Sequence, residues 1–589
     1  MPELDAPSIV EAEAHLMGGR LEPALHAYAA LLQARPSDPR VQHGLAVTLK
    51  VLGHPHRAEP LLRSAAAATG DPEMLRNHGV LSLELGSFDA AAWSLGRAVE
   101  AAPADALSAA HLAEALLGLQ KNDEALAAAE HAVDLDPSLA LGGYARATAA
   151  ARLCELEARD GASSALWPCL RAELEASPRP CRVPLLGALL LGAPSRLQKE
   201  MVRRRAAAYA GRVLPPAPPR SARARLRIGY LSADLWDHAV GYLFAPFVEA
   251  HDRDRVEVHL FSLRDVKDAT RGRIQAAADR WHDLSTVDED GAASLIRAAS
   301  IDVLVDLGGL TQGARPGILG RRPAPVQVHW LGYPGTVGRA LVDAQIGHVA
   351  RDPEGAEQDF DEGLLRVQGW LGTGGWDFGP CPTRASLGLP EDQLLFAYFS
   401  ASYRIDRALV GAWAEILSAT PDSALWLPDF GLRATENLRK AFASRGVDPR
   451  RLYFTPSEKL SGDGRHRLAD LWLDAFSPSG GTAGILAAWA GVPVVTLAGE
   501  RPQDRTGAMV AHLAGVPELV ADSRTDYVRT AVALARDRTR RQRLSEKLRR
   551  HEGVLFQPRT AAAELEEVLR RAVEARAGWE PKLTFAAAS

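Results

Sequence analysis

Small and apolar residues recur with a period of about 34 residues over the first quarter of the chain. The recurring positions are Gly19, Gly53, Gly86 and Gln120, each followed five residues later by Ala24, Ala58, Ala91 and Ala125, and the loop positions Pro36, Gly70, Pro103 and Pro137. The segments between them carry helical patterns, so each period predicts two helices joined by a tight turn. Small residues near that turn allow the two helices to approach closely.

This spacing is the signature of tetratricopeptide (TPR) repeats. Stacked helix pairs bury apolar faces that one pair cannot bury alone, and they build a concave groove. We therefore predict an N-terminal TPR α-solenoid over residues 1–140, with an ordinary helical bundle as the alternative. Such grooves usually hold an extended segment of another protein, which predicts a protein partner.

The helical pattern continues past residue 140, but the period is lost. We predict that residues 141–220 form a helical cap and linker. The stretch LPPAPPRSARAR, from Leu214 to Arg225, is rich in proline, serine and arginine and marks the clearest domain boundary of the chain.

Beyond this boundary, apolar runs of strand length alternate with amphipathic helical segments. The predicted strands fall at 227–233, 256–263, 301–309 and 326–335, and then at 394–400, 424–429, 451–456, 468–476 and 493–499. Two successive blocks of this kind predict two Rossmann-like domains, at 221–385 and 386–560, followed by a C-terminal helix and tail at 561–589. Since ligands bind beyond the carboxyl ends of such strands, the cleft between the two domains is the predicted active site.

Composition narrows the classes of function. The net charge of −5 gives no broad basic surface for nucleic acid. The four cysteines lack metal-binding spacing, which favours a reducing compartment and no structural zinc. With neither a signal peptide at the N-terminus nor an apolar run of about 18 residues, the chain reads as a soluble cytoplasmic protein without a membrane span.

The segment with the most specific chemistry is DAFSPSGGTAGILAAWAGVPVVT, from Asp474 to Thr496. A short strand is followed by a glycine-rich turn and then by a helix that begins near Thr482. Glycine lets backbone N–H groups approach a ligand, and the start of a helix attracts phosphate. The pattern favours a nucleotide-phosphate site, with a plain tight turn as the alternative.

Several segments resemble the O-linked N-acetylglucosamine transferase family. The segment RRPAPVQVHWLGYPGTVG (321–338) is the most specific of them, and SADLWDHAVGYLF, FAYFSASYRID, the glycine loop and GERPQDR resemble further motifs of that family. The resemblance covers nearly the whole chain, the TPR array included, and is closest to bacterial flagellin O-glycosyltransferases. It implies a GT-B glycosyltransferase that adds sugar to Ser or Thr of proteins held in the TPR groove.

The departures from the family pattern concern the donor. Arg404 stands where the family has a phosphate-binding lysine, Ser400 and Ala401 replace an Asn-Gln pair, and Leu486 replaces an aspartate that holds the ribose. Arginine presents a planar fork suited to phosphate or carboxylate. We therefore expect a CMP-nonulosonic acid donor, such as CMP-pseudaminic acid, with flagellin or a similar protein as acceptor. The alternatives are a UDP-N-acetylglucosamine donor and a non-catalytic TPR adaptor.

The predicted catalytic residues are His238, Asp234 and Arg404. His238 aligns with a histidine proposed as catalytic in the family and is a candidate general base, with a structural histidine as the alternative. Asp234 is expected to orient His238 or to act as the base itself, although solvated loop carboxylates are commoner. Arg404 is expected to stabilise the leaving phosphate. The alternative is that Arg404 only forms a surface salt bridge.

Two further groups complete the predicted site. The predicted donor-binding residues are Ser400, Gly480, Gly481, Thr482, Ala483 and Arg505. The predicted donor or acceptor contacts are Tyr333, Pro334, Gly335 and Thr336, a segment that alternatively serves only to turn the chain. We expect no metal and no cofactor beyond the nucleotide-sugar co-substrate.

Overall fold

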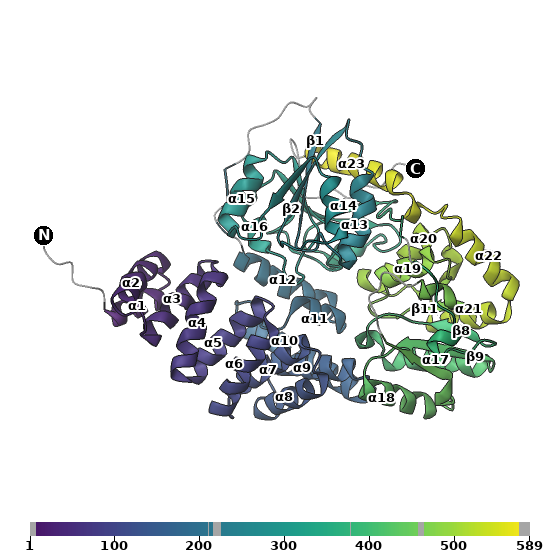
Figure 1. Cartoon of the computed structure of the whole chain (residues 1–589), viewed down its shortest axis with the longest axis horizontal. Helices are drawn as coiled ribbons and strands as arrows, with labels where there is room; N and C mark the ends of the chain where they lie inside the picture. The colour runs from purple at the N-terminus through teal and green to yellow at the C-terminus, as the bar shows by residue number, and fades with distance from the viewer. Residues whose placement is uncertain are drawn as a thin grey trace, which may run out of the picture. The chain divides into compact units, whose positions relative to one another are not determined.

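The computed structural model describes residues 8–209, 211, 213–215, 225–376, 379–456 and 464–575. The chain divides into two compact units (Figure 1). The first comprises Met1–Ala150 and Ala158–Glu173, and the second comprises Ala151–Glu157 and Leu174–Ser589. The predicted fold class, TPR-like helices followed by a parallel α/β region, is confirmed.

The first unit is helical. Its helices are α1 (Ile9–Met17), α2 (Leu21–Ala34), α3 (Pro39–Val51), α4 (Pro55–Thr69), α5 (Pro72–Glu84), α6 (Phe88–Ala101), α7 (Ala106–Gly118), α8 (Asn122–Leu135), α9 (Ala140–Arg152) and most of α10 (Leu156–Ala176). The recurring glycines lie in left-handed turns between paired helices, for example Gly53 at φ 84° between α3 and α4. The recurring alanines are fully buried. The packing is tight at Gly79, where an added β-carbon would lie 2.5 Å from Leu95.

The repeat continues one unit beyond residue 140. Gln120 adopts φ 60° and Cys154, 34 residues later, adopts φ 54° in the turn between α9 and α10. Arg159 follows Cys154 after five positions and is buried, as the alanines are in the earlier repeats. The period is hidden in the sequence because a cysteine and an arginine occupy the positions of glycine and alanine.

The segment after α10 belongs to the second unit. It contains α11 (Leu185–Leu190) and α12 (Ser195–Tyr209), and α12 packs against α16 (Pro316–Gly320). Residues 216–224, where the sequence places the main domain boundary, lie outside the described residues.

The described part of residues 225–369 contains a seven-stranded parallel sheet in the order β3-β2-β1-β4-β5-β6-β7. Its strands are β1 (Leu226–Ser232), β2 (Val256–Ser262), β3 (Arg280–Asp283), β4 (Val303–Asp306), β5 (Val326–His329), β6 (Ala344–His348) and β7 (Gly363–Val367). Its helices, besides α16, are α13 (Ala239–Glu249), α14 (Ala269–Ala276) and α15 (Glu289–Ala298). The central strands are buried on both faces, as their continuous apolar sequences predict.

The described part of residues 379–557 contains a six-stranded parallel sheet in the order β10-β9-β8-β11-β12-β13. Its strands are β8 (Leu394–Ala397), β9 (Ser423–Pro428), β10 (Leu452–Thr455), β11 (Leu471–Leu473), β12 (Val494–Leu497) and β13 (Val520–Ala521). Its helices are α17 (Arg407–Ala419), α18 (Leu432–Ala443), α19 (Thr482–Trp489), α20 (Thr506–Leu513), α21 (Arg524–Arg536) and α22 (Arg538–Arg549).

Short 3-10 helices complete the described elements: η1 (Ala356–Asp359), η2 (Ala385–Leu387), η3 (Ser402–Arg404), η4 (Pro449–Arg451), η5 (Arg465–Leu468), η6 (Pro502–Arg505), η7 (Pro517–Leu519) and η8 (Val554–Phe556).

The last helix, α23 (Pro558–Ala575), returns to the first sheet and packs against α13 and β7 (Figure 1). Glu566 on α23 accepts a hydrogen bond from the backbone N–H of Asp252 at 3.0 Å and lies 2.8 Å from His251 Nδ1. Both side chains of the His251–Glu566 pair are buried. Burial lowers the pKa of His251. The predicted C-terminal helix thus begins at residue 558, while residues 576–589 lie outside the described residues.

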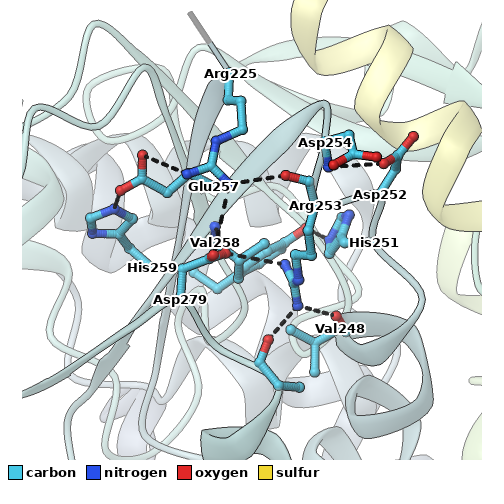
Figure 2. A network of polar contacts seen from close by, with 12 residues as sticks. Arg225, Val248, His251, Asp252, Arg253, Asp254, Glu257, Val258, His259 and Asp279 are labelled. Atoms are coloured by element: carbon cyan, nitrogen blue, oxygen red, sulfur yellow. Dashed lines mark hydrogen bonds and ion pairs between the residues drawn. The ribbon is translucent and has the colours of Figure 1, made fainter.

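A polar network joins the connection after α13 to the amino ends of the first strands. Figure 2 shows Arg225 and Arg253 near the carboxylate of Asp279, which accepts a hydrogen bond from the Val258 backbone N–H at 2.8 Å. Arg225 also donates to the Arg253 carbonyl at 2.9 Å. This network lies at the amino ends of the strands, whereas ligands of such sheets bind at the carboxyl ends. We therefore interpret it as a structural network that joins the strands and not as part of the site.

Among the described residues, no helix combines the length and apolar character that crossing a membrane requires.

Candidate active site

The predicted site residues lie in loops that follow the carboxyl ends of parallel strands, where open α/β sheets bind ligands. His238 and Asp234 follow β1, Arg404 follows β8, Thr482 follows β11 and Arg505 follows β12. The first two belong to the first sheet and the other three to the second.

The glycine loop is organised by Asp474, the first residue after β11. Its Oδ1 accepts hydrogen bonds from the backbone N–H groups of Ala475 and Gly480, both at 2.8 Å. Its Oδ2 accepts a hydrogen bond from the Thr496 hydroxyl at 2.8 Å. Burial raises the pKa of Asp474 to about 6, and these hydrogen bonds oppose that shift.

Arg404 reaches the same loop. One guanidinium nitrogen, Nη1, donates to the carbonyls of Pro478 at 2.8 Å and Ser479 at 2.9 Å. The side chain is half-buried, and no described residue accepts a hydrogen bond from its buried Nε. Among the described residues, Arg404 is attached to the loop and forms no surface salt bridge, which was the alternative. Ser400 is half-buried and precedes Ala401, whose carbonyl accepts a hydrogen bond from the Tyr398 hydroxyl at 3.1 Å.

The helix α19 begins at Thr482 with Gly481 as its N-cap residue. Gly481, Thr482 and Ala483 are all half-exposed. The first turn of any α-helix leaves N–H groups without helical acceptors, and its dipole favours an anion there. No side-chain hydrogen bond caps this helix start in the described structure, so Thr482 does not act as a plain N-cap.

The loop glycines differ in what they permit. A β-carbon on Gly480 would lie 2.6 Å from Asp474 Oδ1, so this glycine is required by the Asp474 carboxylate. A β-carbon on Gly481 would meet only Thr506 at 3.6 Å, an ordinary contact, and one on Gly484 would meet nothing within 4 Å. The first turn of α19 therefore has free space beside the α-carbons of Gly481 and Gly484.

The guanidinium of Arg505 donates to backbone carbonyls outside the glycine loop. Its Nε donates to the Ala350 carbonyl at 3.1 Å and its Nη1 to the Gly499 carbonyl at 3.0 Å. Because Ala350 follows β6 of the first sheet, Arg505 links the two sheets. These two bonds favour a role in domain contact over direct phosphate binding.

In the first sheet, His238 is the N-cap residue of α13. Its Nδ1 accepts a hydrogen bond from the Val240 backbone N–H at 3.2 Å. In the neutral ring the hydrogen then lies on Nε2, which makes Nε2 a donor and not an acceptor. This geometry matches the structural alternative more closely than a general base that uses Nε2.

Asp234 lies beside His238, with Oδ2 3.9 Å from His238 Nδ1. Burial raises the pKa of Asp234, while the charges of His238 and Arg264 oppose the rise. A carboxylate that burial makes more basic is suited to accept a proton from a hydroxyl group. Of the two side chains, Asp234 is the better placed as base.

The segment from Tyr333 to Thr336 is mostly internal. Tyr333 is buried in an apolar cluster with Leu189 of α11, and burial raises its pKa. The buried Thr336 hydroxyl donates to Glu362 at 2.6 Å. A β-carbon on Gly335 would lie 2.5 Å from Leu189. Pro334 is half-exposed while Tyr333, Gly335 and Thr336 are buried, and donor or acceptor contact by this segment stays a prediction.

Sequence reasoning missed the pair that holds this segment. His329 Nε2 lies 2.8 Å from the Tyr333 carbonyl and Nδ1 lies 3.1 Å from Asp306 Oδ2, with both side chains buried. Since a carbonyl only accepts, Nε2 donates its hydrogen to Tyr333, and the ring joins this segment to Asp306 at the end of β4. The sequence signal was a histidine inside an otherwise apolar strand.

Within the described part of the chain, no three or more His, Cys, Asp or Glu side chains are arranged to hold a metal ion.

Comparison with known proteins gives a consistent picture. Residues 215–369 and 380–565 match the model of glycosyl transferase family 41. The chain is 33% identical over 337 residues to the "probable UDP-N-acetylglucosamine–peptide N-acetylglucosaminyltransferase SEC" of Arabidopsis thaliana, covering 55% of this chain and 34% of that protein. It is 28% identical over 465 residues to the UDP-N-acetylglucosamine–peptide N-acetylglucosaminyltransferase of Caenorhabditis elegans, covering 59% of this chain and 40% of that protein.

The chain therefore spans between a third and two fifths of the length of these curated relatives. Among solved structures, a point variant of the Thermobaculum terrenum O-GlcNAc transferase superposes with a TM-score of 0.65 at 27% identity, covering 96% of this chain and 97% of that one.

Proposed function

The chain belongs to glycosyl transferase family 41, and from that membership and the geometry of the site we propose that it is a protein O-glycosyltransferase. It transfers a sugar from a nucleotide sugar to a Ser or Thr hydroxyl of a protein acceptor. The observation that carries the proposal is the convergence of Arg404 and the open start of α19 on one loop at the carboxyl end of β11. Both features present positive charge to a phosphate.

The proposed donor is UDP-N-acetylglucosamine or a close analogue. Relatives of this family carry that donor in their names, and nothing in the comparisons supports the CMP-nonulosonic acid expected from the sequence. The argument for that donor was the guanidinium of Arg404 as a fork for the sugar carboxylate. Its Nη1 donates to the Pro478 and Ser479 carbonyls, so only the other guanidinium N–H groups can face a donor.

In the proposed reaction, the acceptor hydroxyl oxygen forms a bond to the anomeric carbon as the bond from that carbon to the nucleotide phosphate breaks. Arg404 and the first turn of α19 stabilise the charge that develops on the leaving diphosphate. The hydroxyl proton passes to Asp234, either directly or through water, and His238 Nδ1 lies 3.9 Å from the Asp234 carboxylate. The transfer is proposed to need no metal, so chelation by EDTA is expected to leave it unchanged.

The protein acceptor is proposed to bind the TPR helices of the first unit, since solenoids of this type bind protein segments in their grooves. Flagellin remains one acceptor to test among others, because no contact in the structure selects it.

Nucleotide preference tests the donor. The thermal shift of the full chain is measured with UDP, UDP-N-acetylglucosamine and CMP, because a ligand that binds the native state raises its Tm. We expect stabilisation by the two uridine nucleotides and a smaller shift with CMP. A larger shift with CMP would support the CMP-nonulosonic acid donor instead. No shift with any of the three nucleotides would favour the hypothesis of a non-catalytic TPR adaptor.

A further inference from the structure

Asp474 occupies an unusual position, since it is a fully buried carboxylate at the base of the proposed donor loop. Only 1% of the residue is exposed. Two glycines from separate segments make room for it: a β-carbon on Gly480 would lie 2.6 Å from Oδ1, and one on Gly507 would lie 2.2 Å from Oδ2. Burying a charged carboxylate without a paired cation costs free energy, so the hydrogen bonds that this carboxylate accepts must offset that cost.

The carboxylate links three elements that surround the loop. Through the Ala475 and Gly480 N–H groups it closes the loop on itself, and through Thr496 it binds β12. The start of α20 is joined to the same loop, because the Gly507 N–H donates to the Ser479 hydroxyl at 3.0 Å. Arg404 then contacts the Ser479 carbonyl from the other side. The segment 475–480 is thus fixed at both ends just before the start of α19.

We propose that Asp474 is a positioning residue whose carboxylate holds the loop 475–480 in the shape that receives the donor diphosphate. The identity of the ligand in this inference rests on the proposed function. The role of Asp474 in shaping the loop rests on the hydrogen bonds alone. A neutral side chain at this position accepts these bonds less strongly, because a charged acceptor roughly doubles the strength of a hydrogen bond. The loop is then less ordered and the donor binds more weakly.

The surroundings of Asp474 determine how it responds to pH. The titratable groups that interact with it are Arg404 on η3, Tyr398 after β8 and Tyr527 on α21, whose hydroxyl donates to the Asp474 carbonyl at 2.9 Å. Arg404 stays charged and both tyrosines stay neutral between pH 5 and 8. Asp474, with its pKa of about 6, is the member of this group that changes charge in that range. Donor affinity is therefore expected to fall as the pH is lowered through 6.

The test compares the full-length chain with Asp474→Asn, an isosteric neutral replacement. The control variant is Glu566→Gln, which neutralises an equally buried carboxylate on α23. UDP-N-acetylglucosamine binding is measured by calorimetry at pH 7.5 and 5.5. This ligand is suitable because its diphosphate is a diester that does not titrate in the range.

We expect the Kd of the wild type to rise about tenfold between pH 7.5 and 5.5, the size of one charge-assisted hydrogen bond. Asp474→Asn is expected to show the higher Kd at both pH values, and Glu566→Gln to follow the wild type. A variant Asp474→Asn that binds as the wild type does, or that keeps its pH dependence, would overturn the proposal.

Hydrogen–deuterium exchange without ligand separates this proposal from the donor assignment. Asp474→Asn is expected to increase amide exchange in peptides covering 475–480, while peptides of the first sheet remain unchanged. If the wild type binds no UDP-N-acetylglucosamine but this exchange increases, the donor assignment is wrong and the loop role of Asp474 stands. Unchanged exchange in 475–480 refutes the role of Asp474 whatever the donor.

Discussion

Replacing Arg404 with alanine removes the cation that we assign to the leaving phosphate. Its Nη1 makes two hydrogen bonds to loop carbonyls, at 2.8 and 2.9 Å. A hydrogen bond that involves a charged group contributes about 1.5–3 kcal/mol, and the lower end applies here because the side chain is half-exposed. Loss of a donor to the developing charge, which is the role proposed for the other guanidinium N–H groups, lowers kcat by about 10²–10³.

We therefore expect Arg404→Ala to lower kcat/KM for the nucleotide sugar by about 10³, with most of the loss in kcat. Arg404→Lys keeps the charge but not the planar fork, and it is expected to recover part of the activity. The matched control is Arg407→Ala three residues away, whose 3.0 Å ion pair with Glu157 is exposed on both sides. A surface pair of this kind contributes little, so this variant is expected to stay within about twofold of the wild type.

The assay measures initial rates of sugar transfer over a range of donor concentrations, with the folded state of each variant checked by its Tm. An Arg404→Ala variant with kcat within about threefold of the wild type would refute the assigned role. Equal losses in Arg404→Ala and Arg407→Ala would point to a general structural effect.

Three further predictions concern stability. Because burial raises the folded-state pKa of Asp474 from 3.8 to about 6, the stability that this group contributes is present below pH 3.8 and is lost as pH rises through 6. In guanidinium unfolding, the unfolding free energy of the wild type relative to that of Asp474→Asn should therefore fall by about 2.4 kcal/mol from pH 4 to 7.5, and a constant difference would contradict the shift. Glu566→Ala leaves His251 and the Asp252 N–H without their buried acceptor, and it is expected to lower the unfolding free energy by about 3 kcal/mol, whereas no change would mean that the contact is not formed. Gln120→Gly relieves a residue at φ 60° and is expected to raise the free energy of unfolding by about 1 kcal/mol in urea titrations, while a loss would indicate that the glutamine side chain is needed.

The sequence predicted the architecture well wherever a pattern repeats. Gly19, Gly53 and Gly86 mark left-handed turns that the backbone requires, and they make the TPR period visible. The fifth turn was missed because Cys154 adopts the same conformation without being a glycine. Backbone geometry at such a position follows from the packing of neighbouring repeats and not from the local residue.

The site was predicted less completely, because the residues of one motif have different structural roles that the sequence does not distinguish. The glycine loop was expected to bring backbone close to a phosphate, yet Gly480 is required by the buried Asp474 carboxylate. The highly specific segment around Tyr333 and Thr336 serves mainly packing and a bond to Glu362. These contacts join residues far apart in the sequence, so no local pattern predicts them.

The most direct test of the proposed activity is sugar transfer itself. The full chain is incubated with UDP-N-acetylglucosamine and candidate acceptor proteins, flagellin among them, and modified peptides are identified by mass spectrometry. The account predicts N-acetylhexosamine on Ser or Thr of an acceptor with the wild type, and its absence with Arg404→Ala. Failure to transfer from UDP-N-acetylglucosamine, with transfer from a CMP-activated sugar under the same conditions, would contradict the donor assignment.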